Sequence, residues 1–361
     1  MKRVGIVTII DYYNYGNRLQ NYAVCYLLNN RLGCKAVTLE GSASRPIESS
    51  ILRYVKEQLA LQLCRLPSYA EKKLSLKMIR WYNFSEWSRR WIPRRRFYSC
   101  EKLPRALNTR YDFFISGSDQ IWNYRIKDLR LDDFFLTFAD DAKKNSLSAS
   151  FGVNEIPEKY RLYYCDNLSK FSKISVREET GAHIVKDLIG KDVPVLIDPV
   201  MMLSQEEWIH VEKKPRVDIS KPYILEYYLG EKASAINQWA EENGYEIYEL
   251  MNKNEPKLYS AGPGEFISLV RHASLICSDS FHCIAFAILF SKPFIVYERQ
   301  GEEDYMLSRM ETLLGKFGLE NRWNRRLTSD KYLKCDFSEA KESLKCEQNK
   351  FMQYVSEIIQ N

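Results

Sequence analysis

Short apolar runs alternate with longer amphipathic stretches along most of the chain, and each change of pattern predicts a change of element. Val4 to Ile10 and Lys35 to Leu39 have the length of buried strands, whereas apolar residues between Leu19 and Leu27 recur with helical spacing. Strands separated by helices are typical of a parallel sheet with crossover helices. The pattern predicts further strands at 111–116, 146–150, 173–176, 193–197, 222–229, 245–250, 273–276 and 294–297, and further helices at 233–242, 264–272, 283–290, 306–317 and 339–359.

The alternation occurs twice, which indicates two α/β domains. A chain of 361 residues has the length of two ordinary domains. We place the N-terminal domain at 1–198, the C-terminal domain at 199–335 and a closing helix at 336–361. Ser204 followed by Glu207 predicts a capping box that opens a short helix early in the second domain.

One segment breaks the alternation, and we interpret 51–100 as a basic helical insertion in the first domain. Between 51 and 97 there are twelve Lys or Arg residues against three Glu, a net charge of +9, while the whole chain has only +6. Trp81, Trp87 and Trp91 interleave with these charges. Two interpretations stay open: contact with an anionic membrane surface, or helices that pack on the first domain and turn their charges to water. No recognition motif supports nucleic acid as a partner.

The amino-acid composition narrows the class of protein. Charged residues make up 28% and apolar residues 45% of the chain, and no run approaches the roughly 20 apolar residues of a membrane span. The nine cysteines are scattered without a Cys-x-x-Cys pair, which favours reduced thiols over disulfides or zinc. The N-terminus lacks the pattern of a signal peptide. We therefore expect a cytoplasmic protein.

Four polar turns follow predicted strands, where open α/β sheets bind ligands. Their carboxyl-end positions predict that they converge on one cleft between the domains. The first turn contributes Asn14, Gly16, Asn17 and Gln20; the second Gly117, Ser118, Asp119, Gln120 and Trp122; the third Arg177; and the fourth Ser278, Asp279, Ser280, Phe281 and His282.

The fourth turn gives the plainest indication of an active site. It joins an apolar strand to an apolar helix, and the start of a helix offers unpaired N–H groups and a positive dipole end to an anion. His282 is one of four histidines in the chain, and it stands close to Asp279. We expect an active site for an anionic substrate here. The sequence has no P-loop, no Gly-x-Gly-x-x-Gly after the first strand, no Asp-x-Asp and no paired metal-binding histidines, so no metal or cofactor is expected.

Together these blocks resemble the polysaccharide pyruvyl transferase family over roughly residues 4 to 322. The Gly-Ser-Asp-Gln-x-Trp block from Gly117 to Trp122 is quite specific, and the blocks follow the family's order. The matching segments are 14–23, 116–123, 148–152, 175–178, Asp198-Pro199, 278–282 and 292–294.

The resemblance implies a fold and an activity. The fold would be two Rossmann-like domains facing a central cleft, similar to GT-B glycosyltransferases. The donor would be phosphoenolpyruvate, and the acceptor a pair of sugar hydroxyls. The product would be a pyruvate ketal on a bacterial surface polysaccharide, such as a capsule or exopolysaccharide, or on its lipid-linked oligosaccharide precursor. An acceptor of that kind suggests an enzyme at the inner face of the cell membrane.

One departure from the family pattern raises a question about the donor. Some members carry Arg-Leu-His where this chain has Ser280-Phe281-His282, and there the arginine is thought to hold the donor. Carboxylate and phosphate groups favour bidentate arginine recognition. We expect Arg177 to bind one group and Arg299 the other. Arg18 and Arg309 are the fallback candidates.

The remaining roles follow from the reaction. His282 would transfer the proton, Asp119 or Asp279 would orient His282 or the acceptor hydroxyls, and Trp122 would stack on a sugar ring. Backbone N–H groups near Ser280 and Phe281 would hold phosphate. Two alternatives remain: a GT-B-like glycosyltransferase that uses a nucleotide sugar, and a non-catalytic membrane-docking subunit of a polysaccharide assembly complex.

Overall fold

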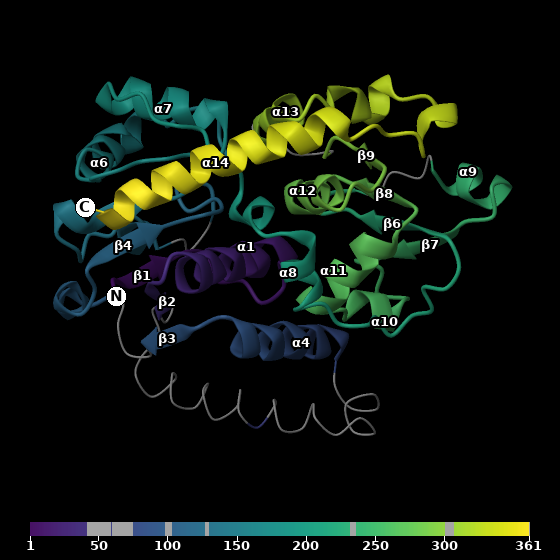
Figure 1. Ribbon diagram of the computed structural model, residues 1–361, viewed down its shortest axis with the longest axis horizontal. Coiled ribbons are helices and arrows are strands. Elements are labelled where there is room, and N and C mark those ends of the chain that lie inside the picture. The colour runs from purple at the N-terminus through teal and green to yellow at the C-terminus, as the bar shows by residue number, and fades with distance from the viewer. Residues whose placement is uncertain are drawn as a thin grey trace.

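The computed structural model describes residues 1–41, 59, 75–97, 103–126, 130–231, 236–299 and 307–360. It contains two parallel sheets, each with helices on both sides, and these form two Rossmann-like units side by side (Figure 1). The predicted α/β class with two Rossmann-like units is confirmed. The exact domain limits stay a prediction.

The N-terminal sheet has the strand order β3-β2-β1-β4-β5, and all its described pairings are parallel. All carboxyl ends therefore meet at one edge of the sheet. Its strands are β1 Arg3–Val7, β2 Lys35–Gly41, β3 Arg94–Phe97, β4 Phe113–Ser116 and β5 Lys144–Ser146. Its helices are α1 Tyr15–Tyr26, α4 Leu76–Trp91, α5 Leu131–Phe134, α6 Glu158–Leu168 and α7 Glu179–Ile189.

The C-terminal sheet has the order β7-β6-β8-β9, again parallel. The predicted capping box is present: the Ser204 hydroxyl accepts from the Glu207 N–H, and the Glu207 carboxylate accepts from the Ser204 N–H. The strands are β6 Tyr223–Tyr227, β7 Glu246–Glu249, β8 Leu275–Ser278 and β9 Phe294–Val296. The helices are α8 Gln205–Ile209, α9 Ile236–Glu242, α10 Pro256–Tyr259, α11 Pro263–His272, α12 Phe281–Leu289, α13 Leu307–Lys316 and α14 Ser338–Gln360.

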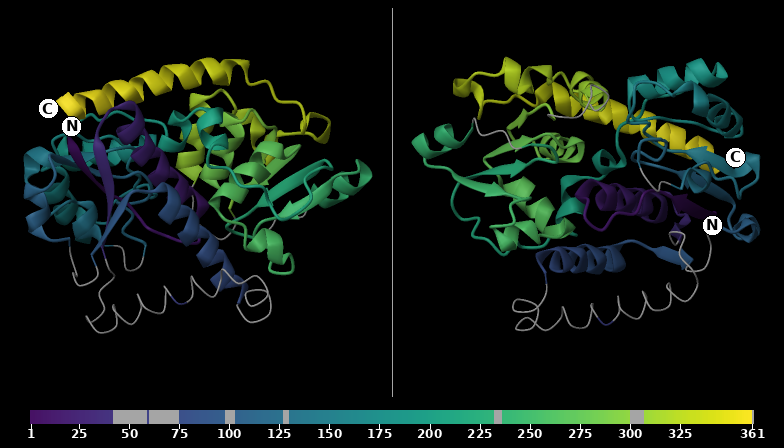
Figure 2. Two further views of the ribbon diagram at one scale, coloured as in Figure 1. Left: turned by 60° about the horizontal axis from the view of Figure 1, so that its bottom comes forward. Right: turned by 180° about the vertical axis from the view of Figure 1, so that it is seen from behind.

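The two units share one hydrophobic core. It joins Leu19 and Tyr22 of α1 to Phe266 of α11 and Phe286 of α12. Helix α14 then runs back from the second unit across the first, as both views in Figure 2 show. Its Tyr354 hydroxyl donates to the carbonyl of Ser146 in β5 at 2.9 Å. A shared apolar core of this kind resists relative movement of the two units.

Two details of the predicted pattern are wrong. The segments 173–176 and 193–197 form only isolated bridges beside β5, because the chain there pairs at single residues such as Val176 with Val195. The strand β3 was missed inside the basic segment, because three consecutive arginines give no apolar alternation. As the outermost strand of its sheet, β3 tolerates charged residues that an inner strand would exclude.

The described part of the basic segment packs inward. Arg80 of α4 is 1% exposed, lies 4.7 Å from the centre of the Tyr15 ring and donates to the Tyr15 hydroxyl at 3.0 Å. The Trp87 indole N–H donates to the Val211 carbonyl of the second unit at 3.2 Å. Helix α4 therefore supports the packing interpretation, with Trp87 buried between the units. Residues 51–58 and 60–74, on which the membrane interpretation also depends, lie outside the described residues.

No helix in the described part of the chain is both long and apolar enough to cross a membrane.

Candidate active site

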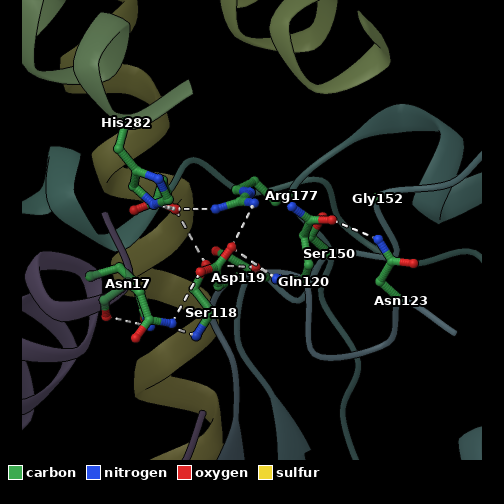
Figure 3. A network of polar contacts seen from close by, with 12 residues as sticks. Asn17, Ser118, Asp119, Gln120, Asn123, Ser150, Gly152, Arg177 and His282 are labelled. Carbon is green, nitrogen blue, oxygen red and sulfur yellow. Dashed lines mark hydrogen bonds and ion pairs between the residues drawn. The ribbon is translucent and has the colours of Figure 1, made fainter. Parts of the chain in front are cut away.

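Three of the four predicted turns meet at the carboxyl edge of the N-terminal sheet, and the fourth brings His282 to them from the second unit (Figure 3). Asp119 follows β4, and Arg177 follows the segment bridged to Ala149. His282 lies in the first turn of α12. The residues brought together are Asn17, Ser118, Asp119, Arg177, Asp198 and His282.

Arg177 is the central cation of this cluster. Its side chain is 1% exposed, and its Nη1 lies 2.6 Å from Oδ2 of Asp198, while its Nη2 lies 3.5 Å from Oδ1 of Asp119. The Phe281 ring covers the guanidinium at 4.4 Å. Burial alone would lower the pKa of Arg177, but the two carboxylates outweigh it and raise that pKa. Arg177 is therefore a permanent positive charge in a dry site.

The two carboxylates remain ionised for the same reason. Burial alone would raise the pKa of Asp198, but the neighbouring His282 and Arg177 hold that pKa well below its usual range. Burial likewise opposes ionisation of Asp119, and Arg177 and His282 overcome it, so the pKa of Asp119 is also lowered. The site thus holds fixed charges of both signs.

His282 is held between the two units. Its Nε2 lies 3.4 Å from Oδ2 of Asp198. The backbone of Gly16 lies against the other side of the ring, so closely that a Cβ on Gly16 would lie 2.0 Å from the His282 Nδ1. Glycine at position 16 is therefore required by close approach, as the sequence predicts for this turn. Gly16 and Asp198 together fix the imidazole against the start of α1.

Two buried N–H positions in this cluster lack a hydrogen-bond partner. They are Nε of Arg177 and Nε2 of His282, which is near Asp198 without forming a bond of good geometry. Unpaired polar atoms in a protein interior are rare and call for an explanation. Both side chains lie at the same carboxylate, that of Asp198.

The first turn supports the site mainly by holding its neighbours. The Asn14 side chain caps α1 by accepting from the Asn17 N–H at 3.2 Å. The Asn17 amide donates to Oδ2 of Asp119 at 3.2 Å. The side-chain oxygen of Gln20, Oε1, accepts from the Ser118 N–H at 3.2 Å, and the Ser118 hydroxyl lies 3.3 Å from Oδ2 of Asp198. Of this set, Asn17 and Ser118 contact the site carboxylates directly.

A second network extends the site along the same edge. The Asn123 amide donates to Oε1 of Gln120 at 2.6 Å, beside Gly152 (Figure 3). The buried Glu178 carboxylate accepts from the Ser150 hydroxyl at 3.0 Å with one oxygen, and its other oxygen is unpaired. Gln120 is half-buried and faces this network, whereas Gly117 is buried under the turn.

Trp122 corrects one prediction. Its side chain is completely buried, and its ring stacks on Phe135 with 5.8 Å between centres and 12° between planes. A ring enclosed in this way cannot lie against a sugar. The aromatic residue after the second turn belongs to the core beneath the site, a choice that the sequence pattern could not make.

Asp279 and Ser278 correct a second prediction. The Asp279 carboxylate accepts from the N–H groups of Leu229 at 2.7 Å and Gly230 at 2.8 Å, and it lies 3.1 Å from Nε of Arg299. It therefore fixes the loop after β6 and does not orient His282; Asp198 faces the imidazole instead. The Ser278 hydroxyl accepts from the Ser280 N–H at 3.0 Å, so that N–H is not available for phosphate.

Arg299 is the arginine expected to bind the donor beside Arg177. It is bound to Asp279, and its role toward the donor stays a prediction. Arg309 of α13 is buried, and its charge interacts with that of Arg177 in the site. Burial and the charge of Arg177 lower the pKa of Arg309 to about 10. Arg18 binds the side chain of Asn17 and the Ile9 carbonyl at 2.9 Å, which gives it a structural role at the first turn.

Asp198 and Glu178 are the site residues that sequence reasoning missed. The sequence places Asp198 at the end of a domain and in a segment that matches the family, although an acidic residue directly after an apolar run is also the pattern of a site carboxylate. Its side chain accepts from the Val200 N–H at 3.0 Å with one oxygen and faces Arg177 and His282 with the other. Glu178 adjoins Arg177 in sequence, and that proximity was the available clue.

A family model described as polysaccharide pyruvyl transferase matches residues 14–301. A search of curated proteins found no match. Among solved structures, a glycosyltransferase from Rickettsia africae is 13% identical with a TM-score of 0.48, and the alignment covers 100% of this chain and 99% of that one. A UDP-GlcNAc 2-epimerase from Neisseria meningitidis is 11% identical with a TM-score of 0.45, covering 99% and 100%. The N-terminal domain of a Candida albicans trehalose-6-phosphate phosphatase is 10% identical with a TM-score of 0.46, covering 100% and 97%.

Proposed function

Because the chain belongs to the polysaccharide pyruvyl transferase family, we propose that it transfers the pyruvyl group of phosphoenolpyruvate to two hydroxyls of one sugar, forming a ketal. The observation that carries this proposal is the pair of buried, unpaired N–H positions on Arg177 and His282. They combine a permanent cation with a group that can give a proton, and an anionic enol ester needs both.

The proposed reaction begins with a proton. His282 gives it to the methylene carbon of phosphoenolpyruvate, which becomes a methyl group, and the neighbouring carbon becomes electrophilic. A first sugar hydroxyl adds there and loses its proton. The carbon–oxygen bond to phosphate breaks, phosphate leaves, and the second hydroxyl adds and loses its proton to close the ketal. The products are the ketal and inorganic phosphate.

The fixed charges suit this sequence. Arg177 offers its unpaired Nε to the donor carboxylate or phosphate while Asp198 and Asp119 hold the guanidinium in place. An ionised Asp198 facing the imidazole supplies the counter-charge of the proton donor. In this proposal Asp119, which is bound by Asn17, accepts the proton of an acceptor hydroxyl. Phe281 covers Arg177 and keeps water from it.

We further propose that the acceptor is a lipid-linked oligosaccharide on the way to a bacterial capsule or exopolysaccharide, modified at the inner face of the cell membrane. The test is to incubate such oligosaccharides with phosphoenolpyruvate and the protein, and to measure both inorganic phosphate and the mass of the oligosaccharide. Phosphate release with a matching pyruvyl gain supports the proposal. Release of a nucleotide from a sugar nucleotide, without turnover of phosphoenolpyruvate, would favour a glycosyltransferase and overturn it.

A further inference from the structure

A second charged group lies at the same sheet edge as the candidate active site. We call it the edge cluster and define it as Tyr12, Arg18, Glu40, Arg94 and Arg96. The Tyr12 hydroxyl donates to Oε1 of Glu40 at 3.0 Å and accepts from Nη2 of Arg96 at 2.8 Å. Nη1 of Arg94 also donates to that hydroxyl. Nε of Arg96 lies 2.7 Å from the Glu40 carboxylate.

The register of the outermost strand builds the cluster. In β3, Arg94 pairs with Thr38 and Arg96 pairs with Glu40 of β2. Alternate residues of a strand share a face, so Arg94 and Arg96 point to one side of the sheet, and Arg95 points to the other. Arg95 lies over the Phe97 ring at 5.5 Å. A run of three arginines thus presents two of them to the loop that carries Tyr12.

The described part of the cluster is rich in positive charge. The guanidinium carbons of Arg18, Arg94 and Arg96 lie 5.5, 5.9 and 5.9 Å from the centre of the Tyr12 ring. The Glu40 carboxylate lies among them, and Asp11 acts on Arg18 from beside the cluster. Burial and the nearby Glu40 raise the pKa of Tyr12, so its hydroxyl stays neutral. The side chains of Arg94 and Arg96 keep 16% and 19% exposure, so their edges reach solvent.

The cluster is connected to the active site through the first turn. Nε of Arg18 donates to Oδ1 of Asn17 at 3.1 Å, and the amide of Asn17 donates to Asp119 at 3.2 Å. In the strand order, β3 stands three places from β4, which leads to Asp119. Three strand spacings amount to roughly 14 Å. A short sugar chain can bridge that distance along the sheet edge.

We propose that the edge cluster binds a phosphate or diphosphate group carried by the acceptor, while the acceptor's reacting hydroxyls reach His282. Guanidinium groups bind phosphate oxygens in a bidentate fork, and two of them side by side on one strand face suit a diphosphate. This inference rests on the proposed function for the identity of the acceptor. The phosphate site itself rests only on the geometry of the cluster.

The first test uses inorganic pyrophosphate as the probe and isothermal titration calorimetry as the measurement, with phosphoenolpyruvate at saturation to occupy the donor site. Arg94→Gln should weaken pyrophosphate binding at least about tenfold. Arg94→Lys, which keeps the charge and loses the fork, should fall between that variant and the wild type. Arg95→Gln, on the opposite face of the same strand, is the matched control and should bind as the wild type does.

The opposite sign is expected at Glu40. Glu40→Gln removes a carboxylate that competes with the ligand, so it should bind pyrophosphate more tightly, although it loses ion pairs with Arg94 and Arg96. If the cluster had only a structural role, pyrophosphate binding would be weaker or unchanged in both Arg94→Gln and Glu40→Gln. Equal pyrophosphate binding in the wild type and in a folded Arg94→Gln variant overturns the inference.

Two further arms separate the sources of phosphate and the two proposals. In the first, the wild type is floated with phosphatidylglycerol vesicles. If it binds the vesicles, loses that binding in Arg94→Gln and does not bind pyrophosphate, the cluster is assigned to lipid headgroups and the acceptor site is overturned. The calorimetry needs no turnover, so its failure leaves the pyruvyl transfer intact. Absence of phosphate release from phosphoenolpyruvate by the wild type would overturn the proposed function and leave the phosphate site standing.

Discussion

The two units contain the same local motif and use it differently. Each has a serine and an aspartate at the carboxyl end of a buried strand: Ser118-Asp119 follows Gly117 just beyond β4, and in Ser278-Asp279 the serine is the last residue of β8. Asp119 faces Arg177 and takes the Asn17 amide, so it belongs to the site. Asp279 accepts two backbone N–H groups and pairs with Arg299, so it holds a loop.

The difference comes from what each aspartate meets across the strand ends. The loop after β6 passes Asp279 with its backbone exposed, and a carboxylate satisfies those N–H groups well. Asp119 accepts one local backbone N–H, from Gln120, but from distant segments it meets the side chains of Asn17 and Arg177. A motif at the end of a strand therefore indicates a position in the fold, and its neighbours from distant segments decide whether it takes part in chemistry.

The largest effect is expected at His282. His282→Ala should lose at least about two orders of magnitude in turnover of phosphoenolpyruvate, the usual contribution of a general acid. The thermal midpoint should change little, because the ring fills a site rather than a core. His183→Ala, an exposed position on α7, is the control. Near-normal turnover in the first variant would remove His282 from the mechanism.

The two halves can be compared directly by substituting their carboxylates. Asp198→Asn leaves the buried Arg177 without its nearest counter-charge, so it should cost about 3 kcal/mol or more of unfolding free energy and reduce the rate as well. Asp279→Asn should cost about 1–2 kcal/mol and leave the chemical step nearly intact. Denaturation curves and single-turnover rates check both. A larger rate loss in Asp279→Asn would reverse the comparison.

A smaller effect is expected at Gly16. In Gly16→Ala the new methyl group would meet Nδ1 of His282, so the ring must move, and the rate should fall about 10- to 100-fold through misplacement. The control is Gly315→Ala in α13, where the nearest atom is 3.8 Å away and stability should be unchanged or higher. An unchanged rate in Gly16→Ala would show that the ring position is not critical.

The smallest effect concerns acid stability. The pKa values of Asp119 and Asp198 are lowered on folding, so their contribution is complete above the ordinary carboxyl pKa of about 3.9 and is lost as the pH falls through the lower folded values. Unfolding free energy should therefore decrease as the pH falls below about 4, and this part of the slope should become shallower in Asp198→Asn. Equal slopes in both proteins between pH 2 and pH 5 would contradict these shifts.

Much of the fold could be predicted because apolar runs and helical spacing record burial directly. The carboxyl-end turns of β1, β4 and β8 were found this way, and so were Asn17, Asp119, Arg177 and His282. The burial of Trp122 could not be predicted, since an aromatic residue suits a core and a sugar site equally. The pairing of Asp198 with Arg177 and His282 depends on contacts 21 residues apart in one case and across the two units in the other.

The most direct test of the account is to run the reaction in heavy water and examine the methyl group of the product. If His282 protonates phosphoenolpyruvate at its methylene carbon, the methyl group of the sugar-bound pyruvate ketal should carry one deuterium, and His282→Ala should form almost no product. Mass spectrometry and NMR of the purified oligosaccharide measure both. A ketal methyl group without deuterium, or a product that gains a sugar instead of a pyruvyl group, would contradict the central claim.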